Sequence, residues 1–296
     1  TMTYSFNLID EPFVPCLLPD GSKTELGLRD VLARAHELRE IRDDSPIVTL
    51  TLHRLLLAIL HRSFGPADMD QWRAIWEAGR FDMGVLDKYL GQWHEWFDLF
   101  HPERPFYQTA GLVTDVQTPA LLFENLSSGN NATLFDHTSE ERASGITPAT
   151  AARGVIARQG YALAGTPSSQ TITIADRLVK ITTSRMRGPL AKSLLLLTRG
   201  ESLFNTLMLN LQRPEQADPD EDVPIWERGS GESIMQLSRP AGPIDLYTFQ
   251  CRRLRLEAPS EDGLVHGLHF AQGRTLADDR LCRKPSMLGA CSLAPA

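Results

Sequence analysis

Segments with the periodicity of strands and of helices follow one another in this chain without regular alternation. Residues 6–17 predict a strand that enters a loop, and Asp20-Gly21 predicts a turn between two strands. Helical patterns dominate up to about residue 100, and strand patterns return from residue 171. A doubly wound sheet needs strands and helices to alternate, so this order favours an α+β fold.

Three helices are predicted in the first third of the chain, beginning with a short one over residues 26–32. The second follows Pro46 and carries one apolar stripe at helical spacing, formed by Val48, Leu52, Leu55, Leu56, Ile59 and Leu60. The third is rich in aromatic residues over 90–100. It stops before Pro102, because the residue preceding a proline disfavours helix.

Thr147-Pro148 predicts the start of another helix, since proline suits the first helical turn. This helix is expected to run to about Ala164 and to break at Gly165. The later predictions are, in chain order, a strand over 171–183, a helix over 190–211, a surface loop over 213–233, and strands over 244–256 and 264–272 that meet at a turn near Asp262-Gly263.

The composition narrows the class of protein. The net charge of −7 disfavours bulk, sequence-independent binding of nucleic acid, so local charge matters more than the total. No apolar run has the length of a membrane span, and the first residues lack the pattern of a signal peptide. The four cysteines show no metal-binding spacing, which predicts reduced thiols, no cofactor and a cytoplasmic location.

Signals for catalysis are weak. His94-Glu95 lies on a predicted helix, but Asp98 stands where a zinc helix needs its second histidine. The acid pairs Asp43-Asp44 and Asp278-Asp279 could hold a metal ion, although each lies in a predicted turn without a third ligand. The alternative to a non-enzymatic protein is therefore a metal-dependent nuclease acting on DNA.

Positive charge is concentrated in two segments that would suit a phosphate backbone. Residues 177–200 hold no acid and six cations, which are Arg177, Lys180, Arg185, Arg187, Lys192 and Arg199. The second segment holds Arg252, Arg253 and Arg255, and alternation along a strand would place the last two on one face. The alternative is a set of solvated side chains paired with acids elsewhere.

An amide-rich loop over residues 127–137 carries Phe135 in its middle. Such a loop suits phosphate contacts combined with one stacking or wedging aromatic group. The alternative is an ordinary surface loop whose Phe135 is anchored in the core.

Five short sequence blocks follow one another along the chain. They are FNLIDEPFVP (6–15), LRDVL (28–32) followed by RLLLAIL (54–60), HPERPFYQT (101–109), SGNNATLF (128–135) and RGESLFNTLMLNL (199–211). Together they resemble the CasA family, the large subunit of the type I-E CRISPR Cascade complex, with Phe13 in place of a common tryptophan. The resemblance covers about residues 6–275.

The resemblance implies a non-catalytic subunit of an RNA-guided antiviral complex. Its implied partners are the other Cascade subunits, CRISPR RNA, target double-stranded DNA and a helicase–nuclease, with no membrane. It would help to recognise the protospacer-adjacent motif in duplex DNA, promote strand opening and dock the helicase–nuclease. Protein would read the short motif while guide pairing reads the remaining sequence.

The resemblance also assigns residues to DNA or RNA contact. They are Asn130, Asn131 and Phe135 in the first loop, Gly165 and Thr166 in a glycine loop, and His266 where the family has a groove-inserting lysine, with Arg274 as a substitute. The basic residues Arg185, Arg187 and Lys192 are added as phosphate contacts. No residue is assigned to catalysis or to a metal.

The expected organisation is one CasA-like N-terminal domain over residues 1–284 and an unassigned tail over 285–296. The family's C-terminal helical bundle is expected to be missing, as in a fragment or a shortened form.

Overall fold

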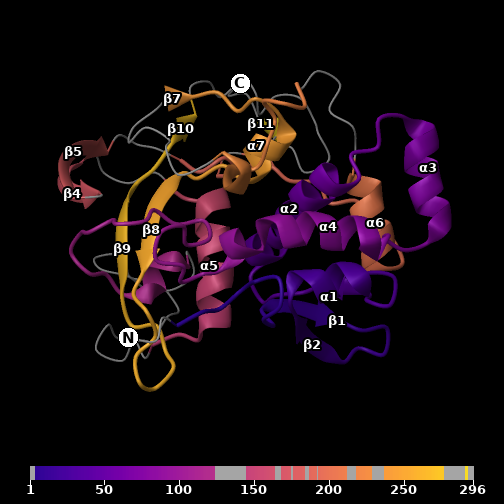
Figure 1. The fold of residues 1–296 in the computed structure, drawn as a ribbon, viewed down its shortest axis with the longest axis horizontal. Helices are drawn as coiled ribbons and strands as arrows, with labels where there is room; N and C mark the ends of the chain where they lie inside the picture. Colours follow the sequence, from indigo (N-terminus) through magenta and orange to yellow (C-terminus); the bar gives the residue numbers. More distant parts are fainter. Residues whose placement is uncertain are drawn as a thin grey trace.

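The structure is a computed structural model that describes residues 4–123, 145–163, 168–174, 176–183, 187–191, 193–211, 218–228, 237–276 and 291–292. Helices α2 (Pro46–Ser63) and α5 (Pro148–Gly160) lie at its centre, with helices on one side and, on the other, the ribbon of β8 (Arg252–Leu256) and β9 (Leu268–Gln272) (Figure 1). Helices and small, mostly antiparallel sheets are mixed along the chain, which confirms the predicted α+β class.

The first sheet has β1 (Val14–Leu17) between β2 (Lys23–Leu26) and β3 (Glu40–Ile41), with both neighbours antiparallel. The turn between β1 and β2 falls at Asp20 and Gly21, as predicted. Gly21 has a φ of 87°, a left-handed conformation that glycine adopts without a steric penalty. Asp20 stabilises the same turn by accepting a hydrogen bond from the backbone of Ser22 at 2.8 Å.

Helix α1 (Leu28–Ala33) leads to α2 (Pro46–Ser63), whose start is marked by Ser45 as N-cap and Pro46 in the first turn. The six residues of the predicted apolar stripe on α2 are all buried, but burial is not limited to that stripe. Every residue from Thr51 to His61 is buried, because α2 packs against four helices, which are α4 (Met83–Trp93), α5, α6 (Leu203–Asn210) and α7 (Pro243–Tyr247). A helix enclosed in this way has no face left for solvent.

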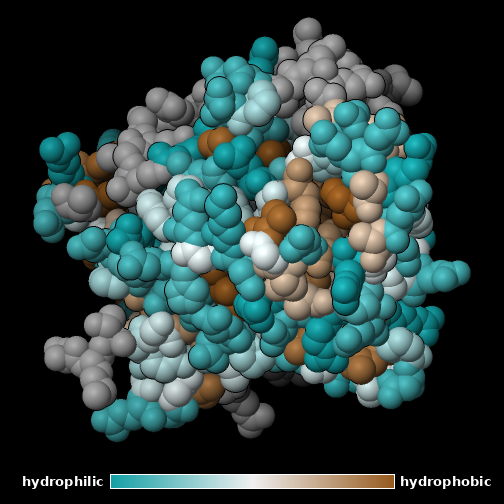
Figure 2. Space-filling view, turned by 45° about the vertical axis from the view of Figure 1, so that its right-hand side comes forward, coloured by the Kyte–Doolittle hydropathy of each residue, from teal (hydrophilic) through white to brown (hydrophobic). Residues whose placement is uncertain are grey.

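Helix α3 (Met69–Ala78) precedes α4 (Met83–Trp93) and the short 3-10 helix η1 (His94–Phe97). The predicted aromatic helix is therefore split between the last two, and α3 was not predicted. Trp72 of α3 stacks on Trp76 at 5.2 Å and donates a hydrogen bond to the carbonyl of Met208. Apolar side chains gather in the centre of the face on this side of the molecule (Figure 2).

Helix α5 (Pro148–Gly160) starts as predicted, since the Thr147 hydroxyl accepts a hydrogen bond from the backbone of Thr150. It ends at Gly160 instead of near Ala164. Gly160 lies against Thr51 of α2, where a Cβ would come within 2.7 Å of the threonine methyl group, and its carbonyl accepts from Leu190. These contacts redirect the chain away from the helix.

The segment predicted as one strand over 171–183 is a hairpin of β4 (Ser168–Ile174) and β5 (Arg177–Thr183). The helix predicted over 190–211 is limited to α6 (Leu203–Asn210). Before it, β6 (Ser193–Leu194) pairs with β11 (Cys291–Ser292). Asn210 donates a hydrogen bond to the carbonyl of Thr198, which holds the extended segment before α6 in place.

The remaining elements include the strands of the β8–β9 ribbon. Beside η2 (Pro119–Leu122) and η4 (Ile225–Glu227) they are the parallel pair β7 (Leu237–Ser238) and β10 (Thr275–Leu276), helix α7 (Pro243–Tyr247), and the antiparallel pair β8 (Arg252–Leu256) and β9 (Leu268–Gln272). The strand expected from Ile244 thus begins as a helix. Trp226, within the predicted surface loop, is buried.

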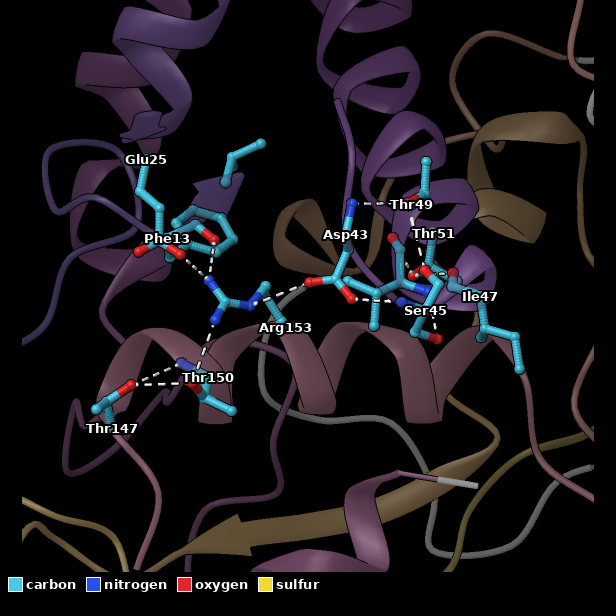
Figure 3. A network of polar contacts seen from close by, with 12 residues as sticks. Phe13, Glu25, Asp43, Ser45, Ile47, Thr49, Thr51, Thr147, Thr150 and Arg153 are labelled. Atoms are coloured by element: carbon cyan, nitrogen blue, oxygen red, sulfur yellow. Dashed lines mark hydrogen bonds and ion pairs between the residues drawn. The ribbon is translucent and has the colours of Figure 1, made fainter. Parts of the chain in front are cut away.

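Arg153 of α5 fixes this helix to the N-terminal sheet (Figure 3). Its guanidinium donates hydrogen bonds to the Phe13 carbonyl at 2.9 Å and to Glu25 Oε1 at 2.7 Å. It also forms an ion pair with Asp43, which accepts a hydrogen bond from the backbone of Ser45 at the start of α2. One side chain therefore sets the position of α5 relative to both β1–β2 and α2.

Among the described residues, no helix combines the length and the apolar character needed to cross a bilayer.

Candidate nucleic-acid interface

The β8–β9 ribbon places its arginines on two sides. Arg253 and Arg255 alternate with Leu254 along β8, so they share one face, as the sequence predicts. Arg252 points the opposite way and is 5% exposed. The ribbon therefore carries positive charge both on its outer face and against the core.

The buried side brings two guanidinium groups together. Arg252 donates to the carbonyls of Cys251 at 2.9 Å and Leu163 at 3.0 Å. Arg158 of α5 lies over the ring of Phe270 on β9, 5.4 Å from its centre. Burial lowers the pKa of Arg158 to about 10, and the charge of Arg252 acts in the same direction. This pair is a preformed concentration of positive charge beside Leu163.

The outer side is partly covered by the segment after Gly111. His269 of β9 lies opposite Arg255 in the ribbon and is buried. Its Nδ1 lies 3.0 Å from the carbonyl and 3.2 Å from the amide nitrogen of Thr114. Partial burial also lowers the pKa of Arg253. The side chains of Arg253 and Arg255 are thus partly exposed to solvent on the outer face of the ribbon.

The hairpin β4–β5 packs on this outer face. Leu112, Ile172 and Ala271 form a small buried cluster that joins the segment after Gly111, β4 and β9. The hairpin lies beside β9 at the margin of the molecule (Figure 1) and carries exposed Arg177 and Lys180.

Arg187, a predicted phosphate contact, is exposed and stands next to a tightly packed glycine. The backbone of Gly188 donates to the carbonyl of Ala162, and a Cβ on Gly188 would come within 2.6 Å of the Ala162 nitrogen. Ala162 and Leu163 immediately precede the predicted glycine loop with Gly165. The structure therefore brings the backbone at Gly188, next to Arg187, close to the start of that loop and to Cys251, which precedes Arg252.

Arg274 lies at the same end of the ribbon. It forms an ion pair with the buried carboxylate of Asp245 at 3.1 Å, and its guanidinium lies 4.5 Å from the ring centre of Phe249. Asp245 also pairs with Arg228 at 3.0 Å. Arg274 is largely buried and engaged with these groups.

His266 lies at the opposite end of β9, so the structure does not bring it together with Arg274. Its Nε2 is 2.8 Å from Asp262 Oδ2, and both side chains are exposed. The ring also lies against Gly145, where a Cβ would come within 2.6 Å of it. His266 therefore neighbours the residue at which the chain returns from the predicted contact loop.

The other predicted contact residues lie outside the described part of the chain. They are Asn130, Asn131, Phe135, Gly165, Thr166, Arg185 and Lys192. Their assignment stays a prediction.

The described cations of the segment over 177–200 do not share one surface. Arg199 forms an ion pair with Glu40 of β3, on the side of the molecule where α6 lies. The backbone of Gly200 next to it donates to the hydroxyl of Thr206. For Arg199 the alternative interpretation, a pair with a distant acid, is therefore the correct one.

Three of the candidate residues, His94, Asp43 and His101, have structural partners. His94 pairs with Asp10 at 2.7 Å, and Asp43 pairs with Arg153. His101 accepts hydrogen bonds from the backbones of Glu103 and Arg104 and so shapes a turn. Within the described ranges no three histidine, cysteine or carboxylate side chains are grouped as metal ligands would be. Asp278 and Asp279 lie outside these ranges.

Sequence reasoning missed Arg158, because a single arginine in a helix carries no signal of its neighbours. It also missed two glutamines that hold the ribbon. Gln108 accepts a hydrogen bond from the backbone of Leu256 and donates to the carbonyl of Leu99, and Gln159 contacts the backbone of Arg252. The HPERPFYQT block, which contains Gln108, therefore helps to anchor β8.

Comparisons of the sequence and of the structure with known proteins find the same family. The sequence profile of the family described as CRISPR-associated protein Cse1 (CRISPR_cse1) matches residues 7–283. The CRISPR-associated protein CasA/Cse1 of Thermus thermophilus is 38% identical over 261 residues, which cover 85% of this chain and 49% of that protein. The crystal structure of Thermobifida fusca Cse1 has a TM-score of 0.80 and 32% identity, over 92% of this chain and 52% of that one.

A chain of a structure described as a CRISPR RNA-guided surveillance complex has a TM-score of 0.77 and 26% identity, over 91% of this chain and 56% of that chain. The chain spans about half the length of the relatives that it matches.

Proposed function

Since the chain belongs to the Cse1 family of CRISPR-associated proteins, also called CasA, we propose that it is a non-catalytic, DNA-binding part of an RNA-guided surveillance complex. Family membership confirms the resemblance inferred from the sequence motifs. The observation that carries the proposal is the pair of guanidinium groups of Arg158 and Arg252 beside Leu163, with exposed Arg187 close by.

Exposed Arg187 is open to a phosphate group, while the buried guanidinium of Arg252 and the largely buried one of Arg158 add positive charge near it. Folding has already brought these buried charges together, so a phosphate bound at Arg187 would gain from their electrostatic attraction without contacting them. Phosphate contacts fix the register of a duplex on a protein without reading its sequence. The predicted glycine loop, which follows Leu163, would then be held against the duplex.

The finer proposal is that this end of the ribbon helps to recognise the protospacer-adjacent motif and to promote strand opening. The partners would be CRISPR RNA, the other subunits of the complex and the helicase–nuclease that it docks. Two related structures support the setting, since they are described as CRISPR RNA-guided surveillance complexes.

The test is the salt dependence of duplex binding, measured by fluorescence anisotropy with the full chain in the reconstituted complex. Replacing Arg185, Arg187 and Lys192 by alanine should lower the slope of log Kd against log salt by roughly one per lost phosphate contact. The matched control replaces three exposed cations on other elements, Lys23, Arg73 and Lys88. Equal slopes for the two triple variants would contradict the proposal.

The non-catalytic part is tested separately. Labelled duplex is incubated with the purified chain and magnesium or manganese, and no cleavage is expected. Cleavage that disappears in Asp278→Asn or Asp279→Asn would assign the chain to the nuclease class instead.

A further inference from the structure

The two faces of the β4–β5 hairpin have opposite environments. Ile172 and Val179 lie directly opposite each other and face Leu112 and Ala271 in the small buried cluster. Because side chains alternate along a strand, Thr171, Thr173, Leu178 and Lys180 share the other face. One face of the hairpin is therefore used for packing and the other is free of the body of the protein.

The free face exposes an apolar row. Leu178 is 79% exposed and lies opposite Thr173, which in turn pairs with Val113, 48% exposed. The next row consists of exposed Thr171 and Lys180. Covering such an exposed leucine with an apolar partner contributes roughly 1.5–3 kcal/mol of transfer free energy.

The hairpin projects from the molecule. Its strands lie at the margin of the structure, beyond the β8–β9 ribbon (Figure 1). Each strand has seven residues, which is about 23 Å at ~3.3 Å per residue. A two-stranded ribbon of this kind has the cross-section that the major groove of B-form DNA admits.

The charges around the free face favour a polyanion. Arg177 at the turn and Lys180 on the face are both exposed, and Arg187 follows on the same stretch of chain. The one acid of the described residues over 168–191 is Asp176, which is exposed in the turn with a φ of 62°. The balance is positive, in a chain whose total charge is negative.

We propose that the free face of the β4–β5 hairpin enters the major groove of duplex DNA. The side chains match the chemistry of that groove. Threonine hydroxyls both donate to and accept from base edges, and lysine donates to guanine O6 and N7. Leu178 would contact the thymine methyl group, which stands in the major groove alone. The deep, narrow major groove of an A-form RNA duplex would not admit this ribbon.

The inference rests on the proposed DNA-binding function and adds a second contact to it. Exposed Arg187 would contact phosphates with the charge of the Arg158–Arg252 pair near it, and the hairpin would read base edges in the neighbouring groove. The two contacts are separable, because the hairpin residues lie on a face that packs against nothing in the described protein.

The test compares two 30-base-pair duplexes of one sequence that contains the motif preferred by the complex. In the second duplex the cytosines carry glucosylated 5-hydroxymethyl groups, which fill the major groove and leave the minor groove unchanged. The full chain in the reconstituted complex should bind the modified duplex about tenfold more weakly. The double variant Leu178→Ala, Lys180→Ala should bind both duplexes equally, at about the affinity of the wild type for the modified one.

The controls are the matched double variant Met69→Ala, Lys23→Ala, which removes an exposed apolar side chain and an exposed lysine elsewhere, and Lys180→Ala alone. Melting temperatures verify that each variant folds. Equal wild-type affinity for the two duplexes would overturn the hairpin inference and leave the proposed function intact, whereas failure to bind either duplex would remove both. Normal DNA binding by the hairpin variant with weaker assembly of the complex would assign the face to a protein partner instead.

Discussion

The side-chain amide of Gln159 pairs with the backbone of Arg252 as a neighbouring strand would. The Arg252 N–H donates to Gln159 Oε1 at 3.0 Å, and Gln159 Nε2 donates back to the Arg252 carbonyl at 2.9 Å. The same Nε2 donates to the carbonyl of Tyr107, which holds a left-handed φ of 56°. One buried side chain thus fixes the first residue of β8 and a strained turn relative to α5.

Gln159→Leu keeps the size of the side chain and removes all three hydrogen bonds. Buried backbone groups that lose their partner are costly, so the free energy of unfolding should fall by about 3 kcal/mol. Urea denaturation measures the change. The control is Gln92→Leu on the exposed surface of α4, which should alter stability by less than about 0.5 kcal/mol. A loss below that of the control would show that water replaces the amide.

Gly188→Ala should destabilise the protein by about 2 kcal/mol, because the new methyl group would lie within 3 Å of backbone atoms of Ala162 and Gly160. Gly91→Ala is the opposite case. Gly91 lies inside α4 with nothing within 4 Å of a new Cβ, so its replacement should raise stability by about 1 kcal/mol. Thermal unfolding of the two variants should move the melting temperature in opposite directions. A shift of the same sign would refute the packing described at Ala162.

Asp245→Asn should cost about 3 kcal/mol, since the 2%-exposed carboxylate neutralises both Arg228 and Arg274. The exposed pair of Arg29 and Asp87 has similar geometry, yet Asp87→Asn should cost less than about 1 kcal/mol, because solvent screens the charges. Denaturation at low and high salt separates the two, as only the exposed pair should respond strongly. Comparable losses would mean that burial does not set the strength of the Asp245 pairs.

Because His61 is buried, the protein should lose stability in mild acid. Burial lowers the pKa of His61 from 6.5 to about 4, so the unfolded chain takes up a proton between these values while the folded chain does not. The free energy of unfolding should therefore fall with pH below about 6.5, by about 1.4 kcal/mol per pH unit for one proton. The neighbouring ring is that of Tyr247, and buried His53 shifts in the same direction.

The slope in acid should decrease in His61→Leu and stay unchanged in His36→Gln, which alters an exposed histidine. Urea midpoints between pH 4.5 and 7.5 provide the measurement. If His61→Leu keeps the wild-type dependence of the free energy of unfolding on pH, another group takes up the proton.

Local signals in the sequence identified elements whose ends are determined by nearby residues. The start of α5 at Thr147-Pro148 and the turn at Gly21 follow from capping and from left-handed backbone, and both are present in the structure. The end of α5 could not be read in this way. It depends on Thr51, which is distant in sequence, because the close contact of Gly160 with α2 turns the chain.

Interactions between distant segments explain the other differences. The apolar residues of 190–211 suggested one helix, but Asn210 and Thr206 hold residues 198 and 200 in an extended form through side-chain hydrogen bonds. Positive charge along the same stretch suggested one surface, yet Arg199 is drawn to Glu40 while Arg177 lies on the hairpin. Charge in sequence indicates where a polyanion could bind, and the fold decides which charges meet.

The chain leaves and re-enters the described fold between Phe123 and Gly145 at fixed points. Phe123 packs against Gly154 of α5, and Gly145 lies against His266, next to the backbone pair of Ile146 and Val265. Both ends are thus clamped independently of the 21 residues between them. Doubling such a connection costs only about 0.6 kcal/mol of closure entropy. The described scaffold could therefore accept a segment of different length or sequence between these two points without being redesigned.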